Sequence, residues 1–235
     1  MLDNIRIEDI LFLDIETIPA FSSYQELPKV YQDLWDKKAK LIAKNEEDTA
    51  ENLYERAGIY SEFGKIICIS VGAFKDGKLW LKSFFDHDEF VLLKEFAEML
   101  NKGFYRPNQL LCAHNGKEFD YPYIARRMLI NGINPPLILN LAGKKPWEIQ
   151  LLDTMELWKF GDYKNYTSLE LLSAVFGIPS PKNDICGADV AKVYWVEKDL
   201  ERIVEYCQKD VVTIVQIFLK YQCKEILSDD CINIK

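Results

Sequence analysis

The stretch Ile10-Leu11-Phe12-Leu13-Asp14-Ile15-Glu16-Thr17 places two acids within a run of apolar, strand-favouring residues. Because successive side chains of a β-strand point to opposite faces, Asp14 and Glu16 share one face of such a strand, and Leu13 and Ile15 share the other. Neighbouring carboxylates on a central strand repel each other unless a cation neutralises them. Mg²⁺ takes oxygen ligands of this kind, with water or phosphate oxygens completing its shell. On these residues alone, a pair of ordinary surface acids is the simpler interpretation.

The segments that follow have strand-like and helix-like patterns in alternation. Two apolar runs, residues 65–74 and 78–85, flank Asp76-Gly77, which is typical of a β-hairpin turn. Further strands are predicted over residues 109–114 and 149–154, and helices over residues 90–100, 121–129, 167–177 and 188–196. A last, long helix is predicted to follow Asp199, which caps it. Thr167 with Glu170 fits a capping box for the third of these helices. This order predicts an α/β fold with a mixed β-sheet flanked by α-helices.

Residues 19–63 have the pattern of a helical insertion after the first strand. Pro28 suits the first turn of a helix, and Asp48 with Glu51 resembles a capping pair for a second helix. The segment also carries the most basic local cluster of the chain, made of Lys37, Lys38, Lys40 and Lys44. A solvated helix face is one interpretation of these lysines, and a lid that contacts a nucleic-acid backbone is the other. We expect residues 1–235 to form a single domain that includes this insertion.

Composition limits the classes of function. The 235-residue chain is 49% hydrophobic and has a net charge of −8, which argues against a protein that coats nucleic acid electrostatically. It does not exclude an enzyme that takes one strand end into a metal-lined pocket, because the ions supply positive charge. The acidic N-terminal residues do not fit a signal peptide, and no apolar run is long enough to span a membrane. We therefore expect a cytoplasmic protein with reduced cysteines.

Two later segments add further acids. His114-Asn115-Gly116-Lys117-Glu118-Phe119-Asp120 follows a predicted strand and opens a helix, where ligands often bind in α/β sheets. An Asn-Gly turn followed by an Asp N-cap explains the same residues structurally. On the last helix, Tyr206 and Asp210 are spaced i, i+4 and share one face. A surface Asp beside a core Tyr is the alternative there.

Taken in order, the three segments carry a resemblance that none of them carries alone. D-x-E on a first strand, N-x-x-x-F-D at a strand–helix junction and Y-x-x-x-D on a late helix resemble the DEDD superfamily of 3′–5′ exonucleases, in its tyrosine-bearing subclass (DEDDy), which has the ribonuclease H-like fold. The stretch HNGKEFDYPYI, residues 114–124, is similar to the second motif of the proofreading exonuclease domain of family-B DNA polymerases. The resemblance extends from about Leu11 to Ile217. Residues 19–63 are not part of the motif set, and no polymerase domain follows in this sequence.

The resemblance implies roles for individual residues. It makes Asp14, Glu16, Asp120 and Asp210 the metal-binding and catalytic acids, with Tyr206 orienting the attacking water. The residues that it implies to be in contact with substrate are Thr17, Asn115 and Phe119.

The chemistry of phosphodiester hydrolysis agrees with this set of residues. Two divalent ions about 3.5–4 Å apart activate a water molecule and stabilise the leaving oxygen, and Mg²⁺ or Mn²⁺ suits all-oxygen ligation. A Tyr hydroxyl with a pKa near 10 is a poor base at neutral pH, so we assign Tyr206 to positioning. We expect structural roles for Asp153, Lys182, Asp184 and Asp189, and a structural or substrate-facing role for His114.

Three hypotheses of function follow from the sequence. The first is a metal-dependent 3′–5′ exonuclease acting on single-stranded DNA, and the second is a ribonuclease D-like enzyme acting on RNA 3′ ends. Nothing in the sequence reports on the 2′-hydroxyl that separates them. The third is a catalytically silent module that binds nucleic-acid ends or docks onto a polymerase or repair partner.

Overall fold

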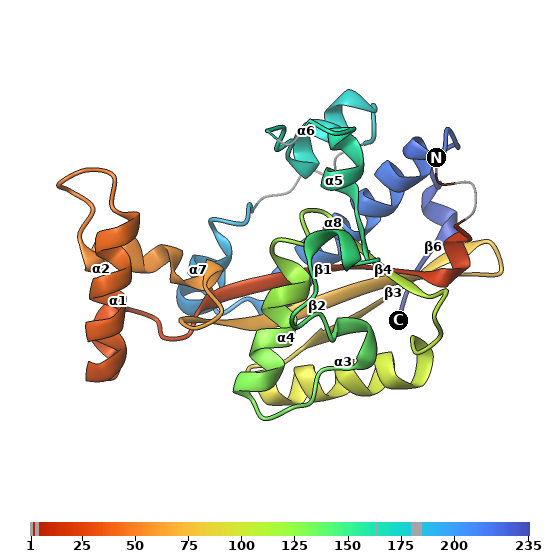
Figure 1. Ribbon diagram of the computed structural model, residues 1–235. Helices are drawn as coiled ribbons and strands as arrows, with labels where there is room; N and C mark the ends of the chain where they lie inside the picture. The colour runs from red at the N-terminus through yellow and green to blue at the C-terminus, as the bar shows by residue number, and fades with distance from the viewer. Residues whose placement is uncertain (1, 3–4, 163, 180–184) are drawn as a thin grey trace.

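The computed structural model describes residues 2, 5–162, 164–179 and 185–235. At the centre of these residues lies a six-stranded mixed sheet with the strand order β5-β4-β1-β2-β3-β6 (Figure 1). The strands are β1 (Ile10–Pro19), β2 (Gly64–Lys75), β3 (Lys78–Phe85), β4 (Leu110–Ala113), β5 (Leu152–Asp153) and β6 (Ile232–Ile234). Strand β1 is central, antiparallel to β2 and parallel to β4. The α/β class predicted from the sequence is confirmed.

Helices cover both faces of the sheet. The α-helices of the described residues are α1 (Lys29–Ile42), α2 (Ala50–Leu53), α3 (Glu89–Gly103), α4 (Asp120–Ile130), α5 (Thr154–Lys159), α6 (Leu169–Val175), α7 (Val190–Lys192) and α8 (Leu200–Tyr221). On one face, Leu11 and Leu13 of β1 pack in a core with residues of α3 and α4. On the other face, Ile10 and Phe12 pack against α8. None of these helices, within the described part of the chain, has the length and hydropathy needed to cross a bilayer.

The predicted hairpin is confirmed. Strand β3 pairs antiparallel with β2 along its whole length, from Phe85 opposite Cys68 to Lys78 opposite Lys75. Between them, Asp76 and Gly77 have φ values of 52° and 76°. Two successive positive φ values are what a type I′ turn needs, which is why Asp-Gly is favoured at this position.

Other elements differ from the prediction in their ends. The strand expected over residues 149–154 is only two residues long, because Asp153 caps α5 and Thr154 already begins that helix. Ser168 rather than Thr167 caps α6, and its hydroxyl accepts the Leu171 N–H. The helix expected over residues 188–196 is α7 followed by a π-helical turn, Val193–Glu197. Strand β6, which the sequence analysis missed, adds a parallel edge strand beside β3.

The segment between β1 and β2 is helical and has a core of its own. Figure 1 shows α1 and α2 beyond the far end of β1, away from the sheet. Trp35, Ala39, Leu53, Tyr54 and Ala57 form the buried cluster of this segment. The expected capping pair is wrong by one residue: Thr49 caps α2 by accepting the Asn52 N–H, whereas Asp48 accepts the Lys44 N–H.

A bulge interrupts the pairing of β1 with β2 next to the two acids. Glu16 lies opposite Cys68 and Thr17 opposite Ile66, so β2 carries one extra residue there. The Ile66 N–H donates to the buried Glu89 carboxylate, which is also paired with Arg127. This ion pair therefore connects the bulge to α3 and α4. A bulge changes the direction of the side chains beside it, and here the neighbouring side chain is Glu16.

We predict that Glu89→Ala lowers the free energy of unfolding by about 3–5 kcal/mol, because it leaves the Arg127 guanidinium buried without its carboxylate. The matched control is Glu98→Ala on the same helix. Glu98 pairs with Lys102 at the surface, and a pair of that kind contributes at most about 1 kcal/mol. Urea denaturation of the two variants measures the difference. Equal losses for both variants would contradict the role given to Glu89.

Candidate active site

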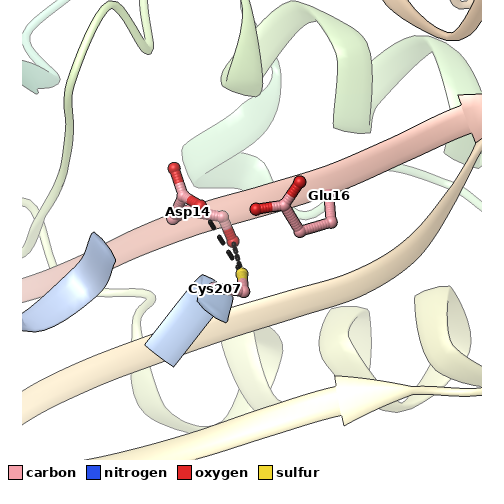
Figure 2. A group of neighbouring side chains, drawn as sticks. All are labelled: Asp14, Glu16 and Cys207. Atoms are coloured by element: carbon pink, nitrogen blue, oxygen red, sulfur yellow. Dashed lines mark hydrogen bonds between the residues drawn. The ribbon is translucent and has the colours of Figure 1, made fainter. Parts of the chain in front are cut away.

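Asp14 and Glu16 lie side by side on the face of β1 that α8 covers. Leu13 and Ile15, which alternate with them, are buried in the core on the opposite face. Figure 2 shows the two carboxylates projecting from β1, with the Cys207 thiol of α8 next to Asp14. One ligand atom from each of these three residues lies within 4.8 Å of the other two. The sheet therefore concentrates two negative charges at one buried point, as the alternation of the strand requires.

Cys207 is a member of this group that the motifs read from the sequence do not include. Its thiol lies 3.4 Å from the Asp14 carbonyl oxygen and 3.5 Å from Asp14 Oδ2. The buried Cys68, opposite Glu16 on β2, packs with Cys207 and Val204. In the sequence, the feature that could have indicated this place for Cys207 is its position between Tyr206 and Asp210, on an otherwise apolar face of the helix.

Asp120 reaches β1 from the first turn of α4. Strand β4 pairs with β1 only from Ile10 to Phe12, so the edge of β1 beyond Phe12 is not paired with β4. At this edge, the Asp120 carboxylate accepts a hydrogen bond from the Ile15 N–H. Ile15 lies between the two acids of β1, so this contact brings a third acid to the group.

Asp210 and Tyr206 approach from α8, one helical turn apart. Both belong to the half of α8 that follows its predicted cap, and the Asp199 side chain does accept the Arg202 N–H there. The Tyr206 hydroxyl donates a hydrogen bond to the Asp210 carboxylate. A helix periodicity of 3.6 residues places such a pair on one face, toward β1.

The acids perturb one another. Burial, followed by the negative charges of Glu16, Asp120 and Asp210, raises the pKa of Asp14 well above its usual range. Burial is also the first cause that raises the pKa of Asp120 to about 7 and that of Asp210 to about 6. The pKa of Glu16 is raised by burial and then by Asp210. The charged groups identified as acting on these carboxylates are acidic, so the pocket stabilises their protonated forms unless a cation binds.

Tyr206 is held in its neutral form. Burial and then the charge of Asp210 raise the pKa of its hydroxyl well above the usual value of 10.0. A phenol in this environment is a hydrogen-bond donor at neutral pH and does not serve as a base.

A divalent cation fits this group by donor chemistry. No basic group is among those that shift the pKa values of Asp14 and Glu16, so ionising these carboxylates costs free energy. Hard cations such as Mg²⁺ and Mn²⁺ prefer carboxylate ligands and would offset that cost. The residues that could hold such ions are Asp14, Glu16, Asp120 and Asp210.

The structure gives a contact or a cavity for each of the three residues expected to contact substrate. Thr17 lies just past the bulge, with its side chain hydrogen-bonded to the Tyr123 hydroxyl. Phe119 packs against the Tyr123 ring at a centroid distance of 5.3 Å. Asn115 has a φ of 61° and lines a cavity of about 180 Å³ together with Lys117 and other residues.

Asp153 holds the loop that leads to Asp120. Its carboxylate accepts the N–H groups of Asn115 and Lys117, each at 3.0 Å, as well as two N–H groups of α5. Gly116 is required in this loop because a Cβ atom there would lie 2.5 Å from the Ala113 Cβ. Asp153 thus has the structural role expected from the sequence.

The remaining polar residues are accounted for by structural contacts. His114 is fixed between the Thr154 hydroxyl and the Thr167 carbonyl oxygen, at 2.9 and 3.0 Å. Asp189 accepts the Cys186 N–H. Lys182 and Asp184 lie outside the described residues.

Comparison with known proteins identifies a family. The model of the family described as a predicted 3′–5′ exonuclease related to the exonuclease domain of PolB matches residues 59–230. A DNA polymerase of Pyrococcus glycovorans is 25% identical over 196 residues, which are 74% of this chain and 24% of the polymerase. The chain thus spans about a quarter of the length of that curated relative.

Solved structures agree on the fold. The family B DNA polymerase from the hyperthermophilic archaeon Pyrobaculum calidifontis superposes with a TM-score of 0.57 and 13% identity, over 91% of this chain and 24% of the polymerase. The RNase domain of the yeast Pop2 protein covers 96% of this chain and 81% of that domain at 12% identity, but its TM-score of 0.39 is too low to carry an argument.

We predict that Asp120→Asn stabilises the metal-free protein at about pH 8 by several degrees in thermal midpoint. The folded state holds a proton on Asp120 up to about pH 7, whereas the unfolded chain releases it near the ordinary pKa of 3.8. The folded wild type therefore loses stability as the pH rises between these values, and Asn removes that loss. Below both pKa values the gain should disappear.

Thermal melts with a chelator over this pH range measure the effect, with the exposed Asp76→Asn as the control for the same chemical change. Mn²⁺ should raise the midpoint of the wild type, and more at the alkaline end, because the cation then meets ionised carboxylates. A gain for Asp120→Asn that is independent of pH would contradict this explanation.

Proposed function

Because this chain belongs to the family of 3′–5′ exonucleases related to the exonuclease domain of PolB, we propose that it hydrolyses phosphodiester bonds at the 3′ end of single-stranded DNA by a two-metal-ion mechanism. The observation that carries the proposal is the meeting of Asp14 and Glu16 of β1, Asp120 of α4 and Asp210 of α8 at one buried point. Three elements far apart in the sequence contribute to it. If these residues were only surface acids or helix caps, their carboxylates would have no reason to lie close together.

In the proposed site, the four carboxylates hold two divalent ions, Mg²⁺ or Mn²⁺. Such ions lower the pKa of a bound water and stabilise negative charge on the leaving 3′ oxygen. The water oxygen attacks phosphorus, the bond from phosphorus to the 3′ oxygen breaks, and that oxygen takes up a proton. The products are a nucleoside 5′-monophosphate and a strand shortened by one residue.

Tyr206 serves as a positioning residue in this mechanism. Its hydroxyl donates to Asp210, which fixes the orientation of a proposed metal ligand. Because its one O–H donates to Asp210, the phenol oxygen remains free to accept a hydrogen bond from the attacking water and so to orient it. The roles proposed for Thr17, Asn115 and Phe119 are substrate contacts, which require these side chains to meet a strand that approaches from outside the acid group.

The rest of the chain supports one site. We propose that residues 1–235 act as a single domain and that residues 19–63 are an insertion within it. A polymerase or repair protein is the partner class that fits a proofreading-type nuclease, in addition to the nucleic acid itself.

We predict that Asp14→Asn lowers hydrolysis of a single-stranded oligonucleotide by about 10³-fold or more, because it weakens the site that holds the cations. Strands labelled at either end should be compared in the presence of Mg²⁺. A 3′ label should appear first as a mononucleotide, and a 5′ label should give a descending ladder. A chelator should stop both, and Asp76→Asn should degrade the strand like the wild type.

Normal degradation by Asp14→Asn, or loss of the 5′ label first, would refute the proposed function. DNA and RNA strands of one sequence in the same assay separate the proposed substrate from the ribonuclease alternative. Faster degradation of RNA would assign the chain to the second hypothesis. Binding of strand ends without cleavage would support the silent module.

For Tyr206→Phe we predict a fall in kcat of about 10²-fold with little change in KM, because the variant keeps the ring but misplaces the water. The alkaline part of the pH–rate profile should keep its shape, since the phenol does not titrate there. Steady-state rates across the pH range test this. A wild-type rate that rises with alkaline pH, and a loss of that rise in the variant, would instead make Tyr206 a base, because a base acts in its deprotonated form.

A further inference from the structure

Two lysine side chains contact the ring of Trp195, beside the proposed site. The ammonium groups of Lys65 and Lys198 lie 5.2 and 5.3 Å from the ring centroid of Trp195. Both distances are within the range of cation–π attraction, so the ring holds the two charges near each other. The Trp195 Nε1–H donates to the Pro19 carbonyl oxygen at 3.2 Å, which fixes the indole at the last residue of β1. We call Lys65, Trp195 and Lys198 the lysine–indole patch.

The patch is close to the acids along the same strand. Pro19 follows Glu16 by three residues, which is roughly 10 Å at the rise of a β-strand. Trp195 and Tyr206 pack against one buried cluster that includes Ile18. Figure 1 shows α7, which leads into the π-helical turn that contains Trp195, next to this end of β1. A strand whose 3′ end reached the acids would therefore have neighbouring phosphates within reach of the patch.

The backbone that presents Lys198 is irregular. Val193–Glu197 is a π-helical turn, and the Lys198 N–H closes it on the Val193 carbonyl oxygen. Lys198 itself has a φ of 60°, a left-handed conformation that a long side chain seldom adopts. π-Turns and residues of this kind are frequent at functional sites, where the surrounding structure holds them in place.

The acids next to the two lysines are engaged with other groups. Glu197 pairs with Arg202 at 2.6 Å and with Lys192 at 3.9 Å. Asp199 caps α8. Beside Lys65, Glu89 is paired with Arg127, and Asp88 caps α3 by accepting the Phe90 N–H. Among the described residues, neither lysine forms an ion pair with these carboxylates, and the Lys65 ammonium donates instead to the His87 carbonyl oxygen at 3.4 Å and the Tyr194 hydroxyl at 3.3 Å. Burial lowers the pKa of Lys65, and the charges of Glu89 and Asp88 oppose that shift. The patch is thus a local positive charge on a chain whose net charge is −8.

We infer that the lysine–indole patch binds the phosphodiester backbone of the single strand whose 3′ end occupies the acid group. This inference rests on the proposed function, since it assigns a second contact to the same substrate. Lysine contacts to phosphates fix the register of a strand without reading its sequence. They also offset the repulsion that an acidic protein exerts on a polyanion. Trp195 acts as a positioning residue, because it keeps the two ammonium groups in place.

The test is binding of a fluorescein-labelled single-stranded oligonucleotide, followed by anisotropy in the presence of a chelator over a salt series. Lys65→Gln and Lys198→Gln should each weaken binding and reduce the slope of log K against log salt by about 0.7, and the double variant by about twice that. The control is Lys102→Gln on α3, which covers the opposite face of the sheet and makes the same change in net charge. Its slope should equal that of the wild type.

A second pair of variants tests the indole. Trp195→Leu should reduce the salt slope and raise KM for oligonucleotide hydrolysis more than it lowers kcat. Trp80→Leu is the matched control, because Trp80 also carries a lysine, Lys235, at 5.4 Å but lies on β3. Thermal melts establish whether each variant is folded. If Trp195→Leu is unfolded, the two lysine variants decide the test.

The outcomes separate this inference from the proposed function. Salt slopes for Lys65→Gln and Lys198→Gln that equal the slope of Lys102→Gln would overturn the patch, even if the wild type degrades the strand. Reduced slopes with no degradation of any labelled strand would support the patch and refute the proposed function. The chelator makes this distinction, since binding is then measured without cleavage.

Discussion

The gathering of four buried or half-buried carboxylates is the constraint on which the site depends. Burial raises the cost of ionising each of them, and the charges of Glu16, Asp120 and Asp210 add to that cost at Asp14. A fold that keeps such a group must hold it with interactions made elsewhere. Here β1 is paired with β2 and β4 and is covered on both faces, by α3 and α4 on one side and α8 on the other.

Two departures from regular strand pairing lie next to this group. Strand β4 ends early, which leaves the edge of β1 to Asp120, and β2 carries the bulge opposite Glu16. Two buried carboxylates outside the group stabilise these irregular places: Glu89 binds the bulge, and Asp153 holds the loop before α4. Both carboxylates accept hydrogen bonds from backbone N–H groups outside the regular pairing of the sheet and helices. The irregular backbone is thus satisfied locally, as buried polar groups must be.

Charge is distributed unevenly about the proposed path of the strand. The acid group suits cations and repels phosphate, whereas the lysine–indole patch near the end of β1 attracts phosphate. An anionic substrate can approach an acidic pocket of this kind only if bound ions and neighbouring lysines compensate for the repulsion. Placing the two features along one strand keeps them in a fixed relation, since β1 lies in the middle of the sheet.

The sequence by itself determined the alternation that puts Asp14 and Glu16 on one face, the Asp-Gly hairpin, the Asp199 cap and the α/β class, because strand periodicity, turn chemistry and capping are local properties. It also placed the acids in the order of a known motif set. Only the tertiary structure decided that Cys207 lies against Asp14, that Asp120 takes the Ile15 N–H, and that Lys65 and Lys198 share one indole. Apart from Lys198 and Trp195, which are neighbours in the chain, these contacts join residues separated by about 100 positions or more. No local pattern encodes the packing that brings such residues together.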